Sequence, residues 1–501
     1  MRVAAESIPL IAGADAHRAR RALIAPDGVW SYADLLDHSA RAATALLTGA
    51  ADLREARVCF LVKPSCAHVA VQWGIWRAGG VAVPLAISHP EPELAYVIDD
   101  AQAAIVVADP DLLPRVRPLA DARRVRWCTS ADLLEASPGA LPAVDPHRRA
   151  LILYTSGTTS RPKGVVSTHA ILAAQIQSVV GAWEWSPADH VLHVLPLHHL
   201  HGVLNLLCSA LWAGATCELL PGFDADAVWS RLDAADGPNL FMAVPTIYSR
   251  LLAAWRSAPP ERQRLLSAAC RRLRLMVSGS AALSVSLLQE WRALSGHTLL
   301  ERYGMTEIGM GLGNPLRGER RPGYVGVPFP GVSVRLVDET GAEVADDAPG
   351  EIQVMGPTVF AEYWQRPDAT RAAFTADGWF KTGDIAMRER GTYRILGRES
   401  IDIIKTGGYK VSALEIEELL RTHPAIVECA VVGVADSEWG QCVGAAVILA
   451  PGASLTLASL RAWARQHLAP YKLPTLLRVV DDLPRNPMGK VQKTTVAATF
   501  L

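Results

Sequence analysis

Residues 154–164 of this chain read Tyr-Thr-Ser-Gly-Thr-Thr-Ser-Arg-Pro-Lys-Gly and combine small hydroxyls, glycine and cations. Small hydroxyl groups and bare backbone N–H groups can approach the oxygens of a polyphosphate closely, and Lys163 adds charge. The spacing is not that of a Walker A loop, because Gly164 follows the lysine and no Ser or Thr does. Apolar residues at 151–153 and 165–166 predict two buried strands joined by a tight loop. The segment therefore indicates a phosphate-binding loop, with a polar surface hairpin as the alternative.

Residues 301–307, Glu-Arg-Tyr-Gly-Met-Thr-Glu, carry side chains that suit a nucleotide. They follow an apolar pair, which predicts a position at the carboxyl end of a strand, where open α/β sheets bind ligands. Tyr303 can stack on a purine and Thr306 can offer its hydroxyl to a phosphate. Glu307 is a hard oxygen ligand of the kind that Mg²⁺ binds. A helix N-terminus capped by Thr306 is the alternative for an isolated copy of this pattern.

Three further groups could contribute chemistry. Asp384 ends the turn-like segment 379–384, and a carboxylate there can accept both hydroxyls of a ribose, although most such segments are plain turns. Lys490 is a lone lysine on a glycine-containing segment near the end of the chain, where a solvated charge is the usual outcome. The histidines at 198, 199 and 201 have no acid or cysteine among them, so we expect no zinc site there.

These residues need a scaffold, and the hydrophobic pattern predicts one. Short apolar runs alternate with helical patterns through the first 330 residues, for example a strand at 58–62 followed by a helix at 67–78. Such alternation predicts parallel sheets with crossover helices. Gly- and Pro-rich turns between short strands predict a β-rich, barrel-like region at about 322–396. A smaller mixed region follows, with a domain boundary at 397–402.

Size and composition narrow the class of protein. A chain of 501 residues is too long for one hydrophobic core, so two or more domains are expected. The net charge of −1 gives no electrostatic footprint for nucleic acid or an anionic membrane. The eight cysteines contain no Cys-x-x-Cys pair and are expected to be reduced thiols of a cytoplasmic protein. We expect no secretory signal, and a buried core segment instead of a membrane span at 203–220.

Taken in order, these motifs resemble those of the ANL superfamily of adenylate-forming enzymes, over about residues 25 to 495. The resemblance rests on Thr-Ser-Gly-Thr-Thr-x-x-Pro-Lys-Gly, Pro-x-x-His-x-x-Gly at 196–202, Tyr-Gly-x-Thr-Glu, and Pro-x-x-x-x-Gly-Lys at 484–490. It implies an α/β fold with a large N-terminal adenylation domain at 1–397, including a β-rich subdomain at about 322–396. A hinge at 398–402 and a smaller mobile α+β C-terminal domain at 403–501 are also implied.

The resemblance also implies roles for individual residues. Lys490, Thr306, Glu307 and His199 would be catalytic, with Glu307 binding Mg²⁺. CoA would enter through a tunnel lined by Gly407, Gly408, Tyr409 and Lys410. ATP would be bound by Thr155, Ser156, Gly157, Thr158, Thr159, Lys163, Ser280, Ala281, Ala282, Tyr303, Gly304, Asp384 and Arg398.

One segment departs from the family pattern. Glu399, Ser400 and Ile401 separate Arg398 from Asp402, which is one residue longer than usual. The residue on which the hinge pivots is therefore left open.

The acyl-CoA synthetase branch is the closest match, and within it the malonyl-CoA synthetases. A dicarboxylate needs a cation for its second carboxylate, because burying that charge unpaired costs several kcal/mol. Arg302 and Arg250 match that branch as candidates, with His201 beside them where the family often has an aromatic gate. This implies ATP-dependent ligation of malonate to coenzyme A, with methylmalonate as a second candidate, through an acyl-adenylate that releases AMP and pyrophosphate. Alternatively, Arg302 pairs with Glu301 or Glu307.

The sequence is also compatible with other functions. The chain could activate another small or medium carboxylic acid, or be a stand-alone adenylating ligase, although no acid that would hold an α-amine stands out. A luciferase-type oxygenase shares the fold. A non-enzymatic relative would be expected to have lost Lys163, Glu307 or Lys490, and all three are present. A monomer or a homodimer with small-molecule substrates is expected.

Overall fold

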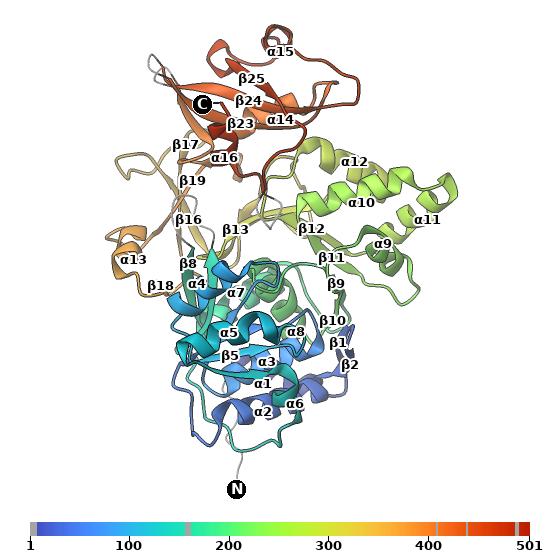
Figure 1. Ribbon diagram of the computed structural model, residues 1–501. Coiled ribbons are helices and arrows are strands. Elements are labelled where there is room, and N and C mark those ends of the chain that lie inside the picture. The colour runs from blue at the N-terminus through green and yellow to red at the C-terminus, as the bar shows by residue number, and fades with distance from the viewer. Residues whose placement is uncertain (1–7, 156–161, 407–408, 437–438, 486–489, 501) are drawn as a thin grey trace.

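The computed structural model describes residues 8–155, 162–406, 409–436, 439–485 and 490–500. It is a mixed α/β structure with a large N-terminal domain built on sheets and a smaller C-terminal domain, as predicted. In Figure 1 the C-terminal domain, in orange and red, lies over the end of the N-terminal domain opposite its blue helices.

Within the described residues the strands form four sheets, and the largest carries much of the cavity wall. Its inner strands pair in parallel, and β11 and β12 are buried along their whole length, as expected for strands covered on both faces. In spatial order its strands are β15 (Val327–Pro328), β14 (Gly309–Gly313), β13 (Leu300–Met305), β12 (Leu275–Gly279), β11 (Leu240–Ala243), β9 (His190–His193), β10 (Thr216–Leu219), β1 (Arg21–Ala25) and β2 (Gly28–Ser31).

The second sheet contains the two strands predicted around the phosphate motif. They are antiparallel, and their register places Thr155 opposite Lys163 at the base of the connecting loop. This confirms the predicted pair of strands, whereas loop residues 156–161 lie outside the described residues. In spatial order its strands are β18 (Glu362–Tyr363), β8 (Lys163–Thr168), β7 (Arg149–Thr155), β4 (Val81–Pro84), β3 (Arg57–Leu61), β5 (Ile105–Ala108) and β6 (Arg126–Thr129).

The third sheet is the predicted β-rich region, and the fourth belongs to the C-terminal domain. The antiparallel register of the third sheet sets Asp384 directly opposite Arg398. Its strands are β16 (Ser333–Val337), β17 (Pro349–Met355), β19 (Phe380–Glu389) and β20 (Thr392–Arg398). The C-terminal strands are β22 (Tyr409–Ser412), β21 (Ile403–Thr406), β24 (Gly440–Leu449), β23 (Ile426–Asp436) and β25 (Leu476–Val479).

Helices cover the sheets, and several of them begin at a side-chain cap. Thr168 accepts a hydrogen bond from the N–H of Ile171 at the start of α7, and Ser284 accepts one from Leu287 at the start of α12. The N-terminal helices are α1 (Pro9–Ala14), α2 (Tyr32–Leu47), α3 (Cys66–Arg77), α4 (Glu91–Asp100), α5 (Leu113–Arg123), α6 (Ser130–Glu135), α7 (His169–Ala182), α8 (Ser209–Trp212), α9 (Ala225–Asp233), α10 (Pro245–Ser257), α11 (Pro260–Arg271), α12 (Val285–Ser295) and α13 (Pro367–Ala373). The C-terminal helices are α14 (Ala413–Leu420), α15 (Leu457–Ala464) and α16 (Lys493–Ala498), and short 3₁₀ turns are η1 (Asp15–His17) and η3 (Pro470–Lys472).

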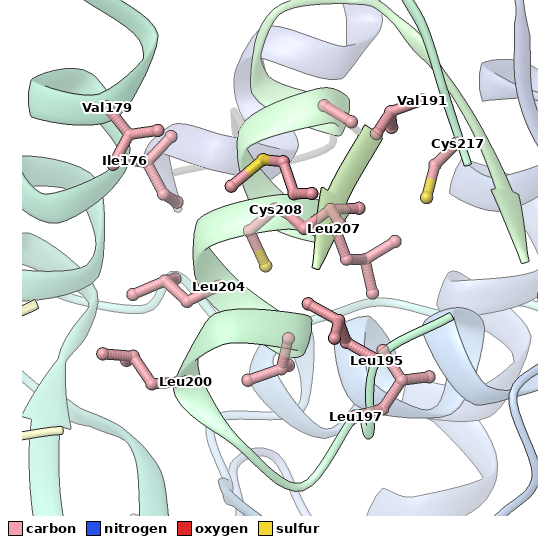
Figure 2. Packing of buried hydrophobic residues seen from close by; sticks show 14 of the residues in the cluster. Ile176, Val179, Val191, Leu195, Leu197, Leu200, Leu204, Leu207, Cys208 and Cys217 are labelled. Atoms are coloured by element: carbon pink, nitrogen blue, oxygen red, sulfur yellow. The ribbon is translucent and has the colours of Figure 1, made fainter. Parts of the chain in front are cut away.

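A π-helical segment, η2 (His201–Cys208), precedes α8 and is buried throughout. Figure 2 shows Leu204, Leu207 and Cys208 packed between Ile176 and Val179 of α7 and Val191 of β9. The prediction that 203–220 is a buried core segment is confirmed. None of the helices in the described ranges has the length and apolar composition needed to cross a membrane.

Candidate active site

A cavity of about 880 Å³ lies between the N-terminal sheets and the C-terminal domain. Its wall is built from the facing ends of β7 and β8, from β13, and from the β19–β20 hairpin, with the segment after β12 and the C-terminal tail completing it. The predicted residues that line it are Thr155, Lys163, His199, His201, Ser280, Ala281, Ala282, Arg302, Tyr303, Gly304, Thr306, Glu307, Asp384, Arg398 and Lys490. The structure thus gathers residues that are up to 335 positions apart (490 − 155) in the chain.

Several predicted residues fall elsewhere. Tyr409 and Lys410 are exposed and are not among the cavity-lining residues, and Lys410 pairs with Glu339 at 2.5 Å. The remaining candidates of the phosphate loop and the CoA tunnel lie outside the described residues: Ser156, Gly157, Thr158, Thr159, Gly407 and Gly408.

Arg250 requires a correction, because the structure does not bring it into the cavity. It lies exposed on α10, outside the residues that line the cavity. Helix α10 buries Tyr248 and Leu251 against the core. At 3.6 residues per turn, a residue two positions after Tyr248 falls on the opposite face, which here is solvent. Of the two arginines proposed for a second carboxylate, only Arg302 faces the cavity.

Asp384 and Arg398 form an ion pair in the wall. Arg398 donates from Nε to Oδ1 of Asp384 at 2.8 Å, and the phenol of Tyr303 donates to Oδ2 at 2.6 Å. The β19–β20 register sets this geometry, because Asp384 and Arg398 are cross-strand partners. Tyr303 and Arg398 therefore hold the Asp384 carboxylate in one orientation, and a carboxylate so held suits the hydroxyls of a ribose.

Glu307 is connected to a residue that the sequence analysis missed. Tyr363 of β18 donates from its hydroxyl to Oε1 of Glu307 at 2.9 Å. Burial raises the pKa of Glu307, and the hydrogen bond from Tyr363 opposes that rise. The Nζ of Lys163 lies 4.7 Å from the centre of the Tyr363 ring. A tyrosine thus joins the phosphate-motif lysine to the carboxylate, and nothing in the local sequence around residue 363 indicates it.

Lys490 enters the cavity from the C-terminal tail. Its side chain keeps solvent-accessible surface, since it faces the open interior, yet surrounding protein atoms remove much of its hydration. This desolvation lowers the pKa of Lys490, and repulsion from Arg398 lowers it further. The lysine, Arg398 and Arg302 together make this part of the cavity strongly cationic, as binding of an anionic ligand requires.

Arg302 is a buried cation that lacks a protein counter-ion. Its side chain is 4% exposed, and its Nη2 donates to Oγ of Ser280 at 3.0 Å, whereas its Nε has no partner. No carboxylate within the described ranges forms an ion pair with it, which excludes the alternative of a pair with Glu301 or Glu307. Burial lowers the pKa of Arg302 to about 9. Glu301 lies on the opposite face of β13, where it accepts from the N–H of Leu283 at 3.3 Å.

Gly279 leaves room for this guanidinium. A Cβ at residue 279 would lie 2.5 Å from Nε of Arg302, closer than any side-chain contact permits. The parallel pairing of β12 and β13 places Gly279 opposite Arg302. A side chain at residue 279 would therefore displace the guanidinium of Arg302 from this place.

The predicted histidines are neutral. Burial lowers the pKa of His199 to about 4, and burial together with Arg302 lowers the pKa of His201 well below its ordinary value. His201 Nδ1 lies 3.2 Å from Oγ of Ser280, and its Nε2 has no partner. Asn205, four residues later on η2, also lines the cavity with an unpartnered Oδ1, and the sequence analysis missed it. Within the described ranges no cluster of three metal-binding side chains occurs.

Comparisons with known proteins agree with this arrangement. Residues 11–364 match the AMP-binding enzyme family, and residues 415–490 match the AMP-binding enzyme C-terminal domain. The chain is 47% identical to the mitochondrial malonate–CoA ligase ACSF3 of Mus musculus, over 97% of this chain and 90% of that protein. It is 45% identical to the mitochondrial ACSF3 of Homo sapiens, over 99% of this chain and 92% of that protein. The crystal structure of ATP-bound MatB from Rhodopseudomonas palustris superposes with a TM-score of 0.91 at 36% identity, over 99% of both chains.

These relatives correct one expectation. The cysteines were expected to be reduced thiols of a cytoplasmic protein. The mouse and human relatives are both named as mitochondrial proteins, which contradicts the cytoplasmic prediction. Cysteine usage could not distinguish the two locations, because free buried thiols are compatible with either.

Proposed function

The chain belongs to the AMP-binding enzyme family, and from this premise we propose that it ligates malonate to coenzyme A with consumption of ATP. It is an AMP-forming acyl-CoA synthetase, so the reaction passes through an acyl-adenylate and releases AMP and pyrophosphate. Methylmalonate is the second candidate acid. No observation favours a function outside this reaction class.

One observation carries the choice of a dicarboxylate. Arg302 is buried in the cavity wall, and its charge has no carboxylate partner from the protein. An uncompensated buried charge costs several kcal/mol, so the folded protein gains when a ligand brings the missing anion. A malonate whose first carboxylate reacts with ATP can offer its second carboxylate to Arg302. A monocarboxylate would leave the guanidinium unpaired.

The adenylation step uses the cationic side of the cavity. An oxygen of the reacting carboxylate attacks the α-phosphorus of ATP, a new P–O bond forms, and the bond to pyrophosphate breaks. Negative charge builds on the phosphoryl oxygens, and a cation already in place stabilises it without reorganisation. Lys490 is the proposed cation, because it lies in the cavity with Arg302 and Arg398. Asp384 would hold the ribose hydroxyls, and Lys163 and Thr306 would contact the phosphates.

The residues present would give Mg²⁺ one protein carboxylate, that of Glu307. Glu307 is a buried carboxylate held in place by Tyr363, and Mg²⁺ is commonly bound by one or two carboxylates together with substrate phosphates. Glu307 would hold Mg²⁺, which when bound offsets triphosphate charge.

Formation of the thioester needs a second arrangement of the two domains. The thiol sulfur of coenzyme A attacks the carbonyl carbon of malonyl-AMP, the C–O bond to AMP breaks, and the thiol proton is released. We place a hinge at 398–402 between a domain at 1–397, with its β-rich part at about 322–396, and a domain at 403–501. Arg398 is tied to Asp384 of the first part, and Asp402 is tied to Lys493 of the second at 2.6 Å, which supports a pivot between them. Gly407, Gly408, Tyr409 and Lys410 would then line the path of coenzyme A.

Arg302→Ala tests the dicarboxylate claim. A site built around a buried charge rejects ligands without that charge by up to ~10⁴, against ~10–200-fold for a missing methylene. We expect Arg302→Ala to lose most of its kcat/KM for malonate and little of its kcat/KM for propionate, with the KM for ATP kept. An Arg302→Ala enzyme that is unchanged on malonate would contradict the claim.

Gly279→Ala offers a second route to the same result, because the new methyl group must displace the guanidinium of Arg302. We expect it to cost ~10² in kcat/KM for malonate, the scale of a 1 Å misplacement. Gly181→Ala is the matched control, since a Cβ there has no neighbour within 4 Å.

A further inference from the structure

Ser280 occupies a strained position at the centre of the acid-binding wall. It follows the last residue of β12 and lines the cavity. Its φ of 67° lies in the left-handed region, which residues other than glycine, asparagine and aspartate rarely adopt. A glycine would adopt this conformation at no steric cost. A serine at this position therefore needs a reason, and the contacts of its hydroxyl group indicate one.

The Ser280 hydroxyl joins two residues from different elements. Arg302 of β13 donates from Nη2 to Oγ at 3.0 Å, and Nδ1 of His201 on η2 lies 3.2 Å from the same oxygen. A serine hydroxyl can accept from the arginine and donate its own proton to an imidazole nitrogen. Since His201 is neutral, an Nδ1 that accepts this proton leaves the imidazole proton on Nε2.

Two buried nitrogen atoms without a hydrogen-bond partner in the protein indicate a ligand at this place. Nε2 of His201 and Nε of Arg302 are both buried and have no partner. With the tautomer set by Ser280, both atoms carry N–H groups, so both are donors. Two buried donors without an acceptor are costly for the folded protein, and a carboxylate, which is an acceptor only, would satisfy them together.

We propose that Ser280 is a positioning residue for the acid substrate: its hydroxyl locks Arg302 and the Nε2–H tautomer of His201 into one clamp for the distal carboxylate. This rests on the proposed function, because it presupposes a dicarboxylate. It replaces the role in ATP binding expected for Ser280 from the sequence. The two roles predict different kinetics, since an ATP contact would change the KM for ATP with every acid.

The test is Ser280→Gly, which removes the hydroxyl and also relieves the left-handed backbone. We expect kcat/KM for malonate to fall ~10-fold or more, the effect of losing a charge-assisted hydrogen bond. The expected change lies mainly in the KM for malonate, while kcat/KM for propionate and the KM for ATP stay within about twofold of wild type. The melting temperature should not fall. Ser286→Ala, an exposed serine outside the cavity lining, is the matched control.

Three outcomes decide the proposal. Wild-type selectivity for malonate over propionate retained in Ser280→Gly would overturn it. A rise in the KM for ATP with equal losses on both acids would also overturn it, and would return Ser280 to the nucleotide site. A wild-type enzyme without preference for malonate would refute the proposed function, and the clamp with it. Should Ser280→Gly not fold, Ser280→Ala removes the same hydroxyl and is judged by the same criteria.

Discussion

Charge is distributed unevenly among the residues of the cavity. Arg398 has Asp384 as a counter-ion at 2.8 Å, whereas Arg302 has only the hydroxyl of Ser280. Lys490 lies near both arginines and feels their repulsion. An anionic substrate would relieve this repulsion. The proposed ribose site holds the paired arginine and the proposed acid site holds the unpaired one. Binding and catalysis should therefore respond differently to loss of each cation.

Lys490→Ala should affect only the adenylation half-reaction, because one lysine on the C-terminal tail can reach the α-phosphate in only one domain arrangement. We expect acyl-AMP formation to fall ~10² or more, the usual cost of removing a preorganised charge donor. Thioester formation from supplied malonyl-AMP should stay nearly intact in single-turnover assays. Lys63→Ala, which removes a surface ion pair with Asp111, is the control. Equal losses in both halves would indicate a structural lysine instead.

Buried histidines should make the fold sensitive to acid. Burial lowers the pKa of His68 and of His193 to about 4 in the folded protein, against 6.5 for an unperturbed histidine. Between pH 6.5 and pH 4 the unfolded chain therefore binds more protons than the folded chain, so stability falls as the pH falls through this window. His68→Gln should reduce the slope by up to ~1.4 kcal/mol per pH unit, the value for one proton.

The measurement is the denaturation midpoint of wild type and His68→Gln between pH 4 and pH 7. His147→Gln, which replaces an exposed histidine, is the control. An identical slope in His68→Gln and wild type would show that His68 does not contribute to the acid sensitivity.

At the level of elements, the residues of the proposed acid site meet because β12, β13 and η2 begin or end at one place. Strand β12 ends at Gly279, its parallel pairing with β13 ends at Arg302, and η2 begins at His201. A π-helix has a wider turn than an α-helix, and such turns are frequent at functional sites. Here His201, the first residue of η2, and Asn205 both line the cavity.

The sequence predicted some of these elements and not others. Strands around the phosphate motif followed from apolar runs and turn residues, and their register confirms them. The π-helical turn could not be predicted, because 203–208 is apolar apart from Asn205 and does not distinguish a π-helical turn from an α-helical one. Arg250 was assigned to the pocket by family resemblance, whereas α10 buries Tyr248 and Leu251 and leaves Arg250 exposed. Tyr363 meets Glu307 only through the pairing of β18 with β8, which no local pattern encodes.

One contact between elements should favour the observed domain arrangement. Glu418 of α14 accepts from the N–H of Val285 at the start of α12, at 2.7 Å, and so links the C-terminal domain to the N-terminal domain. We expect Glu418→Ala to slow acyl-AMP formation ~10-fold, the scale of one charge-assisted hydrogen bond, and to spare thioester formation from supplied malonyl-AMP. Glu290→Ala, which removes an exposed ion pair of α12 with Arg256, is the control. Slowing of both halves by Glu418→Ala would argue against a role in domain placement.

At the level of the whole molecule, neither domain holds a complete site. The N-terminal domain supplies the sheet ends, Asp384, Glu307 and Arg302, and the C-terminal tail supplies Lys490. Family similarity extends through both parts, and ATP-bound MatB superposes over 99% of the chain. A two-part site allows one chain to run two different half-reactions, since a rotation can withdraw one set of groups and present another.

The most direct test is a product assay with purified wild-type protein, ATP, Mg²⁺ and CoA, in which malonate, methylmalonate, propionate and butyrate are compared. We expect AMP, pyrophosphate and malonyl-CoA in equal amounts. The kcat/KM should be highest for malonate, methylmalonate should also be used, and the kcat/KM of the two monocarboxylates should be lower by ~10² or more. Comparable rates on butyrate and malonate would contradict the dicarboxylate site. Release of ADP, or formation of acyl-AMP without thioester, would contradict the ligase itself.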